Sequence, residues 1–126
     1  MGFVVKRGDK YSARLVIPKA LRPILGQNEF KKWAPDLNVI LYVGDGQSRE
    51  VIREFEFYSD DDDPHPGEFL PDVVLTTYDI VLKDSDILDR IMWSVMMLDE
   101  AHRLKNFKSK IFQTLMDYDT KTRVLI

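Results

Sequence analysis

The chain has 126 residues, of which 44% are hydrophobic, and this is sufficient for one small domain with a modest core. It contains no cysteine, which excludes a disulfide framework and a thiolate zinc site. No apolar run approaches the roughly 18 residues of a membrane helix, and the N-terminal residues lack the layout of a signal peptide. We therefore expect no membrane association.

The net charge of −3 is unevenly distributed along the chain. Residues 1–33 carry eight Lys or Arg against two acidic residues, whereas the remaining residues carry ten against nineteen. Such a split indicates two segments with different partners or origins. The basic segment is open to two interpretations, an ordinary solvated face or an attraction to nucleic acid.

The N-terminal segment is predicted to form a β-hairpin followed by a short helix. Residues 3–7 (FVVKR) and 11–17 (YSARLVI) are rich in β-prone side chains, and a Gly-Asp turn signal lies between them. Residues 19–25 (KALRPIL) are predicted to be helical, because a glycine follows them directly.

The remainder of the chain alternates between predicted strands and helices. Short apolar runs predict strands that are buried on both faces, and the segments between them have helical spacing. The predicted strands are residues 38–43, 72–77, 94–98 and 123–126, and the predicted helices are residues 48–58, 79–91 and 109–116. This order predicts an α/β fold with a mostly parallel sheet flanked by helices.

The predicted helix 48–58 has apolar residues at helical spacing, which predicts that they pack inward, and Ser48 is its expected N-cap. These residues are Val51, Ile52, Phe55 and Tyr58. Residues 59–68 contain four consecutive aspartates followed by Pro-His-Pro-Gly. Like charges and turn formers in this number predict a disordered acidic surface loop.

Two adjacent carboxylates, Asp99 and Glu100, follow the predicted strand 94–98. A parallel strand places such residues at the carboxyl edge of the sheet, where α/β proteins bind ligands. In nucleotide hydrolysis, Asp99 would hold a magnesium ion through water, and Glu100 would orient and deprotonate the attacking water. Two adjacent acids are a weak signal alone, but the longer string LDEAHRLKN is a strong one.

Residues from about 29 to 126 resemble the first RecA-like lobe of SWI/SNF-type chromatin-remodelling ATPases, and most of all the chromodomain-helicase group. The strings that carry the resemblance are EFKKWAPDLNVILYVGD, SREVIREFEFY, VVLTTYDIVLKD and MMLDEAHRLKNFKSKIFQTL. It implies that Asp99, Glu100, Ala101 and His102 form motif II, with Glu100 catalytic and His102 coupling the nucleotide site to the next motif. It also implies that Thr76, Thr77 and Tyr78 belong to the motif Ib region, which faces the DNA backbone.

The same resemblance implies ATP and Mg²⁺ as cofactors, DNA and nucleosomes as partners, and the nucleus as the location. A phosphate-cradling loop requires glycines followed by Lys and Ser or Thr. The sequence contains no Gly-Lys-Thr or Gly-Lys-Ser string. We therefore expect a partial RecA-like lobe without autonomous ATPase activity, to which ATP and Mg²⁺ do not bind tightly.

Residues 2–32 read GFVVKRGDKYSARLVIPKALRPILGQNEFKK. This string resembles a different family, the N-terminal arm-type DNA-binding segment of phage-like tyrosine integrases. This resemblance divides the chain into residues 1–32 and residues 33–126, and it implies phosphate contacts through Arg7, Arg14 and Arg22. A natural fusion, a gene-model artefact and a designed chimera would each produce the pattern. The competing functions are a small non-enzymatic DNA-binding module and an inert chimera, and in each case we expect a monomer.

Overall fold

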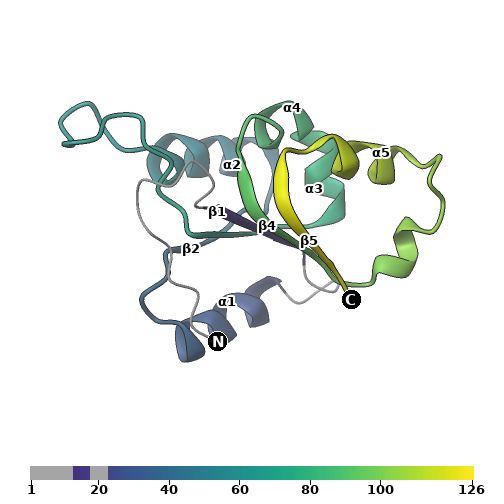
Figure 1. The fold of residues 1–126 in the computed structure, drawn as a ribbon. Coiled ribbons are helices and arrows are strands. Elements are labelled where there is room, and N and C mark those ends of the chain that lie inside the picture. The colour runs from purple at the N-terminus through teal and green to yellow at the C-terminus, as the bar shows by residue number, and fades with distance from the viewer. Residues whose placement is uncertain (1–12, 18–22) are drawn as a thin grey trace.

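The computed structural model describes residues 13–17 and 23–126, and in them it forms an α/β sandwich around one sheet (Figure 1). Five parallel strands lie in the order β2-β3-β1-β4-β5. The strands are β1 (Ala13–Ile17), β2 (Val39–Leu41), β3 (Val73–Leu75), β4 (Trp93–Leu98) and β5 (Thr120–Leu125). The parallel α/β architecture expected from the sequence is confirmed.

The connections between the strands are helical. The α-helices are α1 (Pro23–Trp33), α2 (Gly46–Ile52), α3 (Tyr78–Lys83), α4 (Ser85–Leu88) and α5 (Lys110–Asp117). A π-helical turn, η1 (Arg53–Phe57), extends α2, and a 3₁₀ turn, η2 (Ala101–Leu104), follows β4. In Figure 1, α1 covers one face of the sheet, and α2 to α5 lie on the other.

The strand β1 corrects the predicted hairpin. It lies in the middle of the sheet, parallel to β3 on one side and to β4 on the other. With both edges paired, β1 has no edge left for a hairpin partner. The expected partner, residues 3–7, lies outside the described residues, as does most of the predicted helix 19–25. β1 also packs in the same hydrophobic core as the strands of residues 33–126. Both predicted segments therefore contribute strands to one sheet. That residues 1–32 and residues 33–126 have different origins stays a prediction.

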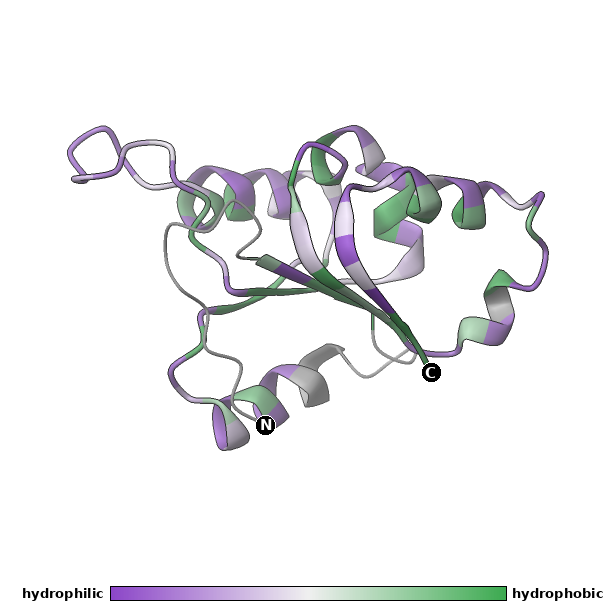
Figure 2. Ribbon diagram, viewed as in Figure 1, coloured by the Kyte–Doolittle hydropathy of each residue, from purple (hydrophilic) through white to green (hydrophobic). Residues whose placement is uncertain are grey.

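Alternation along β1 creates two hydrophobic layers. Ala13, Leu15 and Ile17 contribute to the larger core beneath α3, α4 and α5, while Val16 faces a smaller cluster that includes Phe30 of α1. In Figure 2 the central strands are largely hydrophobic, and β5, at the sheet edge, is more polar. Burial on both faces explains why these strands read as continuous apolar runs.

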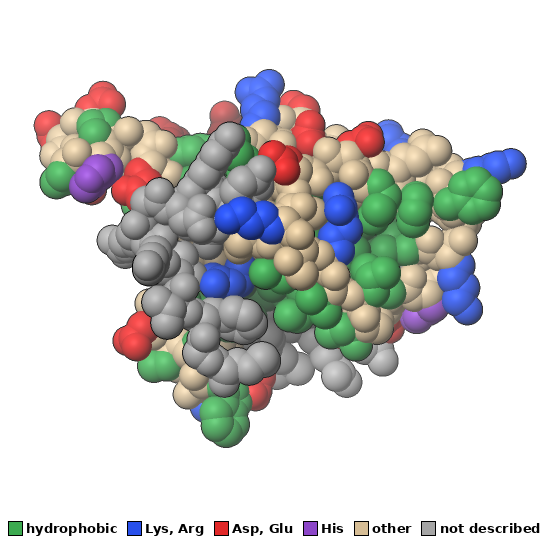
Figure 3. Space-filling view, viewed as in Figure 1, with side chains coloured by type: hydrophobic (Ala, Val, Ile, Leu, Met, Phe, Trp, Pro, Cys, Tyr) green, Lys and Arg blue, Asp and Glu red, His purple; other side chains and the backbone are tan. Residues whose placement is uncertain are grey.

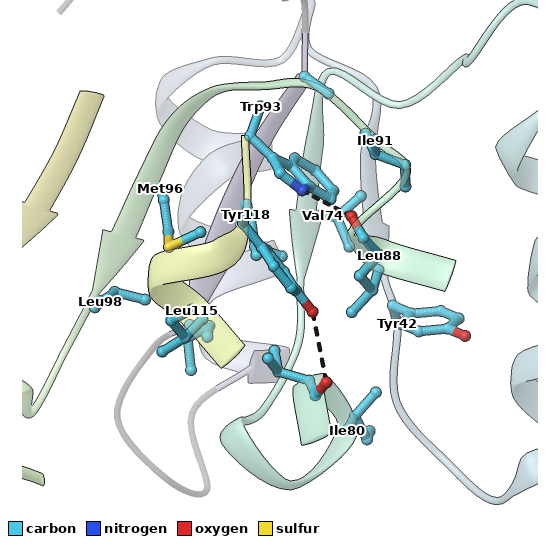
Figure 4. Close-up of a cluster of buried hydrophobic side chains, with 14 of the residues drawn as sticks. Tyr42, Val74, Ile80, Leu88, Ile91, Trp93, Met96, Leu98, Leu115 and Tyr118 are labelled. Atoms are coloured by element: carbon cyan, nitrogen blue, oxygen red, sulfur yellow. Dashed lines mark hydrogen bonds between the residues drawn. The ribbon is translucent and has the colours of Figure 1, made fainter. Parts of the chain in front are cut away.

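The larger core is tied together by aromatic side chains with hydrogen-bonded polar groups (Figure 4). Trp93 is fully buried, and its indole Nε1 donates to the Leu88 carbonyl at 3.1 Å. The hydroxyl of Tyr118 donates a hydrogen bond to the Val81 carbonyl at 3.5 Å. Burying such rings contributes to stability only when their polar atoms find partners, as both do here.

The predicted helix 79–91 is interrupted at Asp84, between α3 and α4. Asp84 is only 7% exposed, and its carboxylate accepts hydrogen bonds from Arg49 Nε at 2.7 Å and from the Tyr42 hydroxyl at 2.5 Å. Arg53 Nη1 in turn donates to the Tyr42 hydroxyl at 2.5 Å. This buried network joins β2, α2, η1 and the α3–α4 junction.

The network also determines which side of α2 and η1 faces the core. Arg49 is 7% exposed and Phe57 is fully buried, whereas Val51 and Phe55 are 51% and 71% exposed. The predicted inward packing of Val51 and Phe55 is therefore wrong, and so is the N-cap at Ser48. Asp45 caps α2 by accepting from the backbone N–H of Ser48 at 2.7 Å.

The acidic segment 59–68 is exposed over most of its length, as predicted, and its disorder stays a prediction. Tyr58 and Phe69 form an antiparallel bridge at its base. Backbone bonds from Ser59 N to the Glu68 carbonyl and from Gly67 N to the Ser59 carbonyl close the loop. These bonds and the turn formers between them close the segment into a loop.

Candidate functional site

The loops that follow β3 and β4 meet at the carboxyl edge of the sheet. The loop after β4 is held by backbone bonds to its neighbours on both sides. Asp99 N donates to the Ile17 carbonyl at 2.9 Å, and Ala101 N donates to the Ile126 carbonyl at 3.0 Å. Residues 99–101 are therefore anchored at the ends of β1 and β5, in the position where parallel sheets bind ligands.

Glu100 adopts a left-handed backbone conformation, with φ 54° and ψ 44°. It is the single non-glycine residue with positive φ among the described residues. This conformation costs an L-residue about 1–2 kcal/mol. The Glu100 N–H donates to Asp99 Oδ1 at 2.7 Å, which stabilises the bend. Backbone strain of this kind concentrates at functional sites.

Tyr78 connects the two loops. Its hydroxyl donates to the backbone carbonyl of Asp99 at 2.6 Å, and the residue is 6% exposed. Thr76 is fully buried, and its hydroxyl donates to the Tyr42 carbonyl at 2.7 Å. The structure therefore does not present Thr76 and Tyr78 on the surface as DNA contacts, because burial removes both side chains from solvent.

Thr77 keeps part of its surface exposed between these two buried residues. Its side chain caps α3 by accepting from the backbone N–H of Ile80 at 3.3 Å. Of the three predicted contacts in this segment, Thr77 is the one whose side chain is accessible to a ligand.

The turn η2 presents His102 to solvent and anchors itself through Leu104, which is 6% exposed. Lys105 N donates to the His102 carbonyl at 3.2 Å and closes the turn. Ser109 then caps α5 by accepting from Phe112 N. His102 is thus placed beside the two carboxylates along the chain, on a turn that packing holds in place.

The carboxylates are compatible with a magnesium site that a nucleotide completes. Within residues 13–17 and 23–126, no cluster of three or more His, Asp and Glu side chains could hold a metal ion by itself. Mg²⁺ in nucleotide sites is usually held by one or two carboxylates with waters and phosphate oxygens, not by a cage of protein ligands. One partly exposed aspartate at a rigid sheet edge, Asp99, meets this requirement.

Of the three arginines predicted to bind DNA, the structure describes Arg14. Arg7 and Arg22 lie outside the described residues. Arg14 lies in the central strand, with Nε and Nη1 buried. Burial lowers the pKa of Arg14 below its ordinary value, and the nearby charge of Asp72 opposes this effect. Those two nitrogens are therefore not available to a phosphate.

Sequence patterns did not indicate the contacts that hold the site. The contacts to the carbonyls of Ile17 and Ile126 cannot be recognised in the sequence, because every residue has a main-chain carbonyl. The Tyr78 hydroxyl reaches a residue 21 positions away. The family resemblance implies a DNA contact for Tyr78, and no sequence pattern indicates its bond to Asp99.

With this geometry established, comparison with known proteins identifies the chain. The SNF2-related domain family matches residues 4–126. The chain belongs to the SNF2-related domain family. The match includes residues 4–32, for which the resemblance to tyrosine integrases was noted, so the family extends through β1.

Named relatives agree with this family. The chain is 45% identical over 98 residues to Protein CHROMATIN REMODELING 5 of Arabidopsis thaliana, covering 78% of this chain and 6% of that protein. It is 40% identical over 100 residues to Chromodomain-helicase-DNA-binding protein 1 of Gallus gallus, covering 79% and 6% respectively. The chain thus spans less than a tenth of the length of either relative.

A solved structure has the same fold. It is described as the Sulfolobus solfataricus SWI2/SNF2 ATPase core in complex with dsDNA, and it aligns with a TM-score of 0.70 and 25% identity. The alignment covers 93% of this chain and 21% of that one. Among the described residues, no helix combines the length and apolarity that crossing a bilayer would require.

Proposed function

We propose that this chain is part of the first ATPase lobe of an ATP-dependent DNA translocase that remodels chromatin. The carrying observation is the placement of Asp99 and Glu100 at the carboxyl edge of a parallel sheet in an SNF2-related domain. The backbone anchors at Ile17 and Ile126 support the proposal, since phosphoryl transfer depends chiefly on positioning and electrostatics.

In this proposal each residue of motif II has a separate task. Asp99 holds Mg²⁺ through water, and the bound ion would neutralise charge on the nucleotide phosphates. Glu100 orients the attacking water and accepts its proton. His102, on the turn η2, links the nucleotide site to the segment that follows.

The chain alone should bind nucleotide weakly, because its sequence has no Gly-Lys-Thr or Gly-Lys-Ser string to cradle phosphates. We expect calorimetric titration with ATP and Mg²⁺ to give a Kd of about 1 mM or weaker, about −4 kcal/mol. Micromolar affinity that is lost in Asp99→Ala or Glu100→Gln would contradict this expectation and would reveal a phosphate site elsewhere in the chain.

DNA is the proposed partner, consistent with the dsDNA complex of the structural neighbour. The contact is assigned to Thr77, which is partly exposed at the N-terminus of α3. The four aspartates at 60–63 repel phosphates, so we expect weak binding that falls steeply with salt. Arg7, Arg14 and Arg22 are the competing assignment.

A salt titration of labelled duplex DNA separates the two assignments. Thr77→Asn and Thr77→Asp both retain an N-cap acceptor, so both should preserve α3. Only Thr77→Asp places a negative charge against the DNA backbone, and it should weaken binding while Thr77→Asn should not. If Arg7→Ala and Arg22→Ala flatten the salt slope while Thr77→Asp changes nothing, the basic segment carries the contact instead.

The broader biological setting follows from the relatives. Their names place them in chromatin remodelling, and one is named as a DNA-binding helicase. We infer that the protein acts in the nucleus, with nucleosomal DNA as the substrate of the whole protein.

We also propose that this chain is a monomer. Sedimentation should then give a monomer, and a concentration-dependent dimer would contradict this proposal.

A further inference from the structure

The segment formed by α2 and η1 turns two arginines and Phe57 inward, and it leaves two large apolar side chains exposed. Arg49 and Arg53 point toward the Asp84 carboxylate, with Nε to Oδ2 and Nη1 to Oδ2 distances of 2.7 and 3.4 Å. Val51 and Phe55, one turn apart on the other side, are 51% and 71% exposed. The ion pairs with Asp84 hold the arginines inward and leave these two apolar residues facing solvent.

A third apolar side chain continues this surface. Tyr58 is 43% exposed, and its ring packs edge-on against Phe69 with centroids 5.6 Å apart. Its position is therefore fixed by the bridge at the base of the acidic loop. Val51, Phe55 and Tyr58 together form an apolar stripe that begins on α2 and ends at this loop.

The part of the chain that carries the stripe is predominantly acidic. Between Gly44 and Glu68 the chain carries nine carboxylates and two arginines, and both arginines bind Asp84. The exposed acidic side chains are Asp45, Glu50, Glu54, Glu56 and Asp60–Asp63. Figure 3 shows acidic side chains gathered on the projection that residues 59–68 form.

We propose that this stripe and its carboxylates form a docking face for a lysine- and arginine-rich peptide segment that carries large apolar anchor residues. Charge complementarity selects the occupant: basic side chains would pair with the surrounding carboxylates, and the anchors would cover Val51 and Phe55. Duplex DNA would be repelled by the same carboxylates. A second copy arranged symmetrically would bring acidic side chains against each other.

The face belongs to α2 and η1, not to the loops after β3 and β4. The proposal therefore does not depend on nucleotide binding or on the assignment of Asp99 and Glu100. Aromatic residues near the centre of an interface commonly dominate its affinity, so Phe55 is expected to be the main anchor point on this side.

The test uses the whole chain and a fluorescein-labelled lysine-rich peptide with leucines spaced i and i+4. Two matched peptides replace either the leucines by serine or the lysines by glutamine. We expect anisotropy to report saturable binding of the first peptide, and both matched peptides to bind about tenfold more weakly or worse. The binding of the first peptide should also weaken as salt screens the carboxylates.

Protein variants locate the contact. Phe55→Gln should weaken binding about tenfold, whereas Phe107→Gln, at an equally exposed phenylalanine that is 66% accessible, should leave it unchanged. The pair Glu50→Gln and Glu54→Gln should reduce the salt dependence. Circular dichroism should show that all variants are folded, because the substituted side chains are exposed.

Several outcomes would overturn the proposal. Absence of binding, equal binding of all three peptides, or equal effects of Phe55→Gln and Phe107→Gln would each exclude a specific docking face. Duplex DNA that competes for Phe55 would reassign the face to nucleic acid. Self-association that Phe55→Gln abolishes would reassign it to a second copy of this chain.

Discussion

The hydroxyl of Tyr78 donates a hydrogen bond to the main-chain carbonyl of Asp99 at 2.6 Å. This bond joins the first residue of α3, which follows β3, to the residue directly after β4, although β1 lies between the two strands. The side chain once assigned to DNA therefore supports the backbone of the acidic motif.

Replacing Tyr78 by Phe removes this bond and leaves the ring in place. We expect the free energy of unfolding to fall by about 1 kcal/mol, because the part-buried Asp99 carbonyl loses this hydrogen bond. Urea denaturation measures the change. Tyr58→Phe is the control, since that ring is 43% exposed, and it should alter stability little. Equal losses in the two variants would show that the bond is not specific to the site.

The backbone of Glu100 predicts an unusual order of stability for its variants. Glu100→Gly and Glu100→Ala both remove the side chain, but only glycine adopts φ 54° without a steric cost. We expect Glu100→Gly to be more stable than Glu100→Ala by about 1 kcal/mol in urea denaturation. In a helix interior the order would be reversed, so greater stability of the alanine variant would exclude the left-handed conformation.

The Asp84 network should give stability a defined dependence on acid. Burial alone would raise the pKa of Asp84, but hydrogen bonds from Arg49 and Tyr42 and the charges of both arginines hold it below its ordinary value. A lowered folded pKa stabilises the protein above the unfolded pKa of about 3.9, and this stabilisation is lost as pH falls through the folded value.

We expect Asp84→Asn to reduce the free energy of unfolding by about 3 kcal/mol at neutral pH, because it leaves buried arginines without their counter-charge. The difference from the wild type should shrink as the pH falls below about 4. Chemical denaturation at several pH values measures it. Asp86→Asn, at an exposed residue two positions away, should show neither effect.

The ionisation of Tyr42 should make the stability of the protein depend on pH in the alkaline range. Burial, followed by the hydrogen bond to Asp84, raises the pKa of Tyr42 to about 12. A raised folded pKa means that stability is complete below the unfolded value of about 10 and is lost as pH rises toward 12. The slope of unfolding free energy over this interval should be smaller in Tyr42→Phe. Identical slopes would place the titration on other groups.

Much of the fold was predictable from the sequence because buried parallel strands have a distinctive composition. The apolar runs at 38–43, 72–77 and 94–98 correspond to β2, β3 and β4, and the carboxylates at 99 and 100 lie at the predicted sheet edge. The string LDEAHRLKN indicated the family, which the match over residues 4–126 confirms. Each of these features depends on residues that are close together in the sequence. It can therefore be recognised without knowing which distant residues it contacts.

The tertiary structure decided the features that depend on distant partners. β1 resembled a hairpin strand because its alternation is local, but its pairing with β3 and β4 is not. The arginines of the helix after Asp45 face inward because they bind Asp84, which is over thirty residues away and is buried at the α3–α4 junction. Hydrophobic spacing alone favours the opposite rotation, and the hydrogen-bonding requirement of a buried carboxylate overrides it.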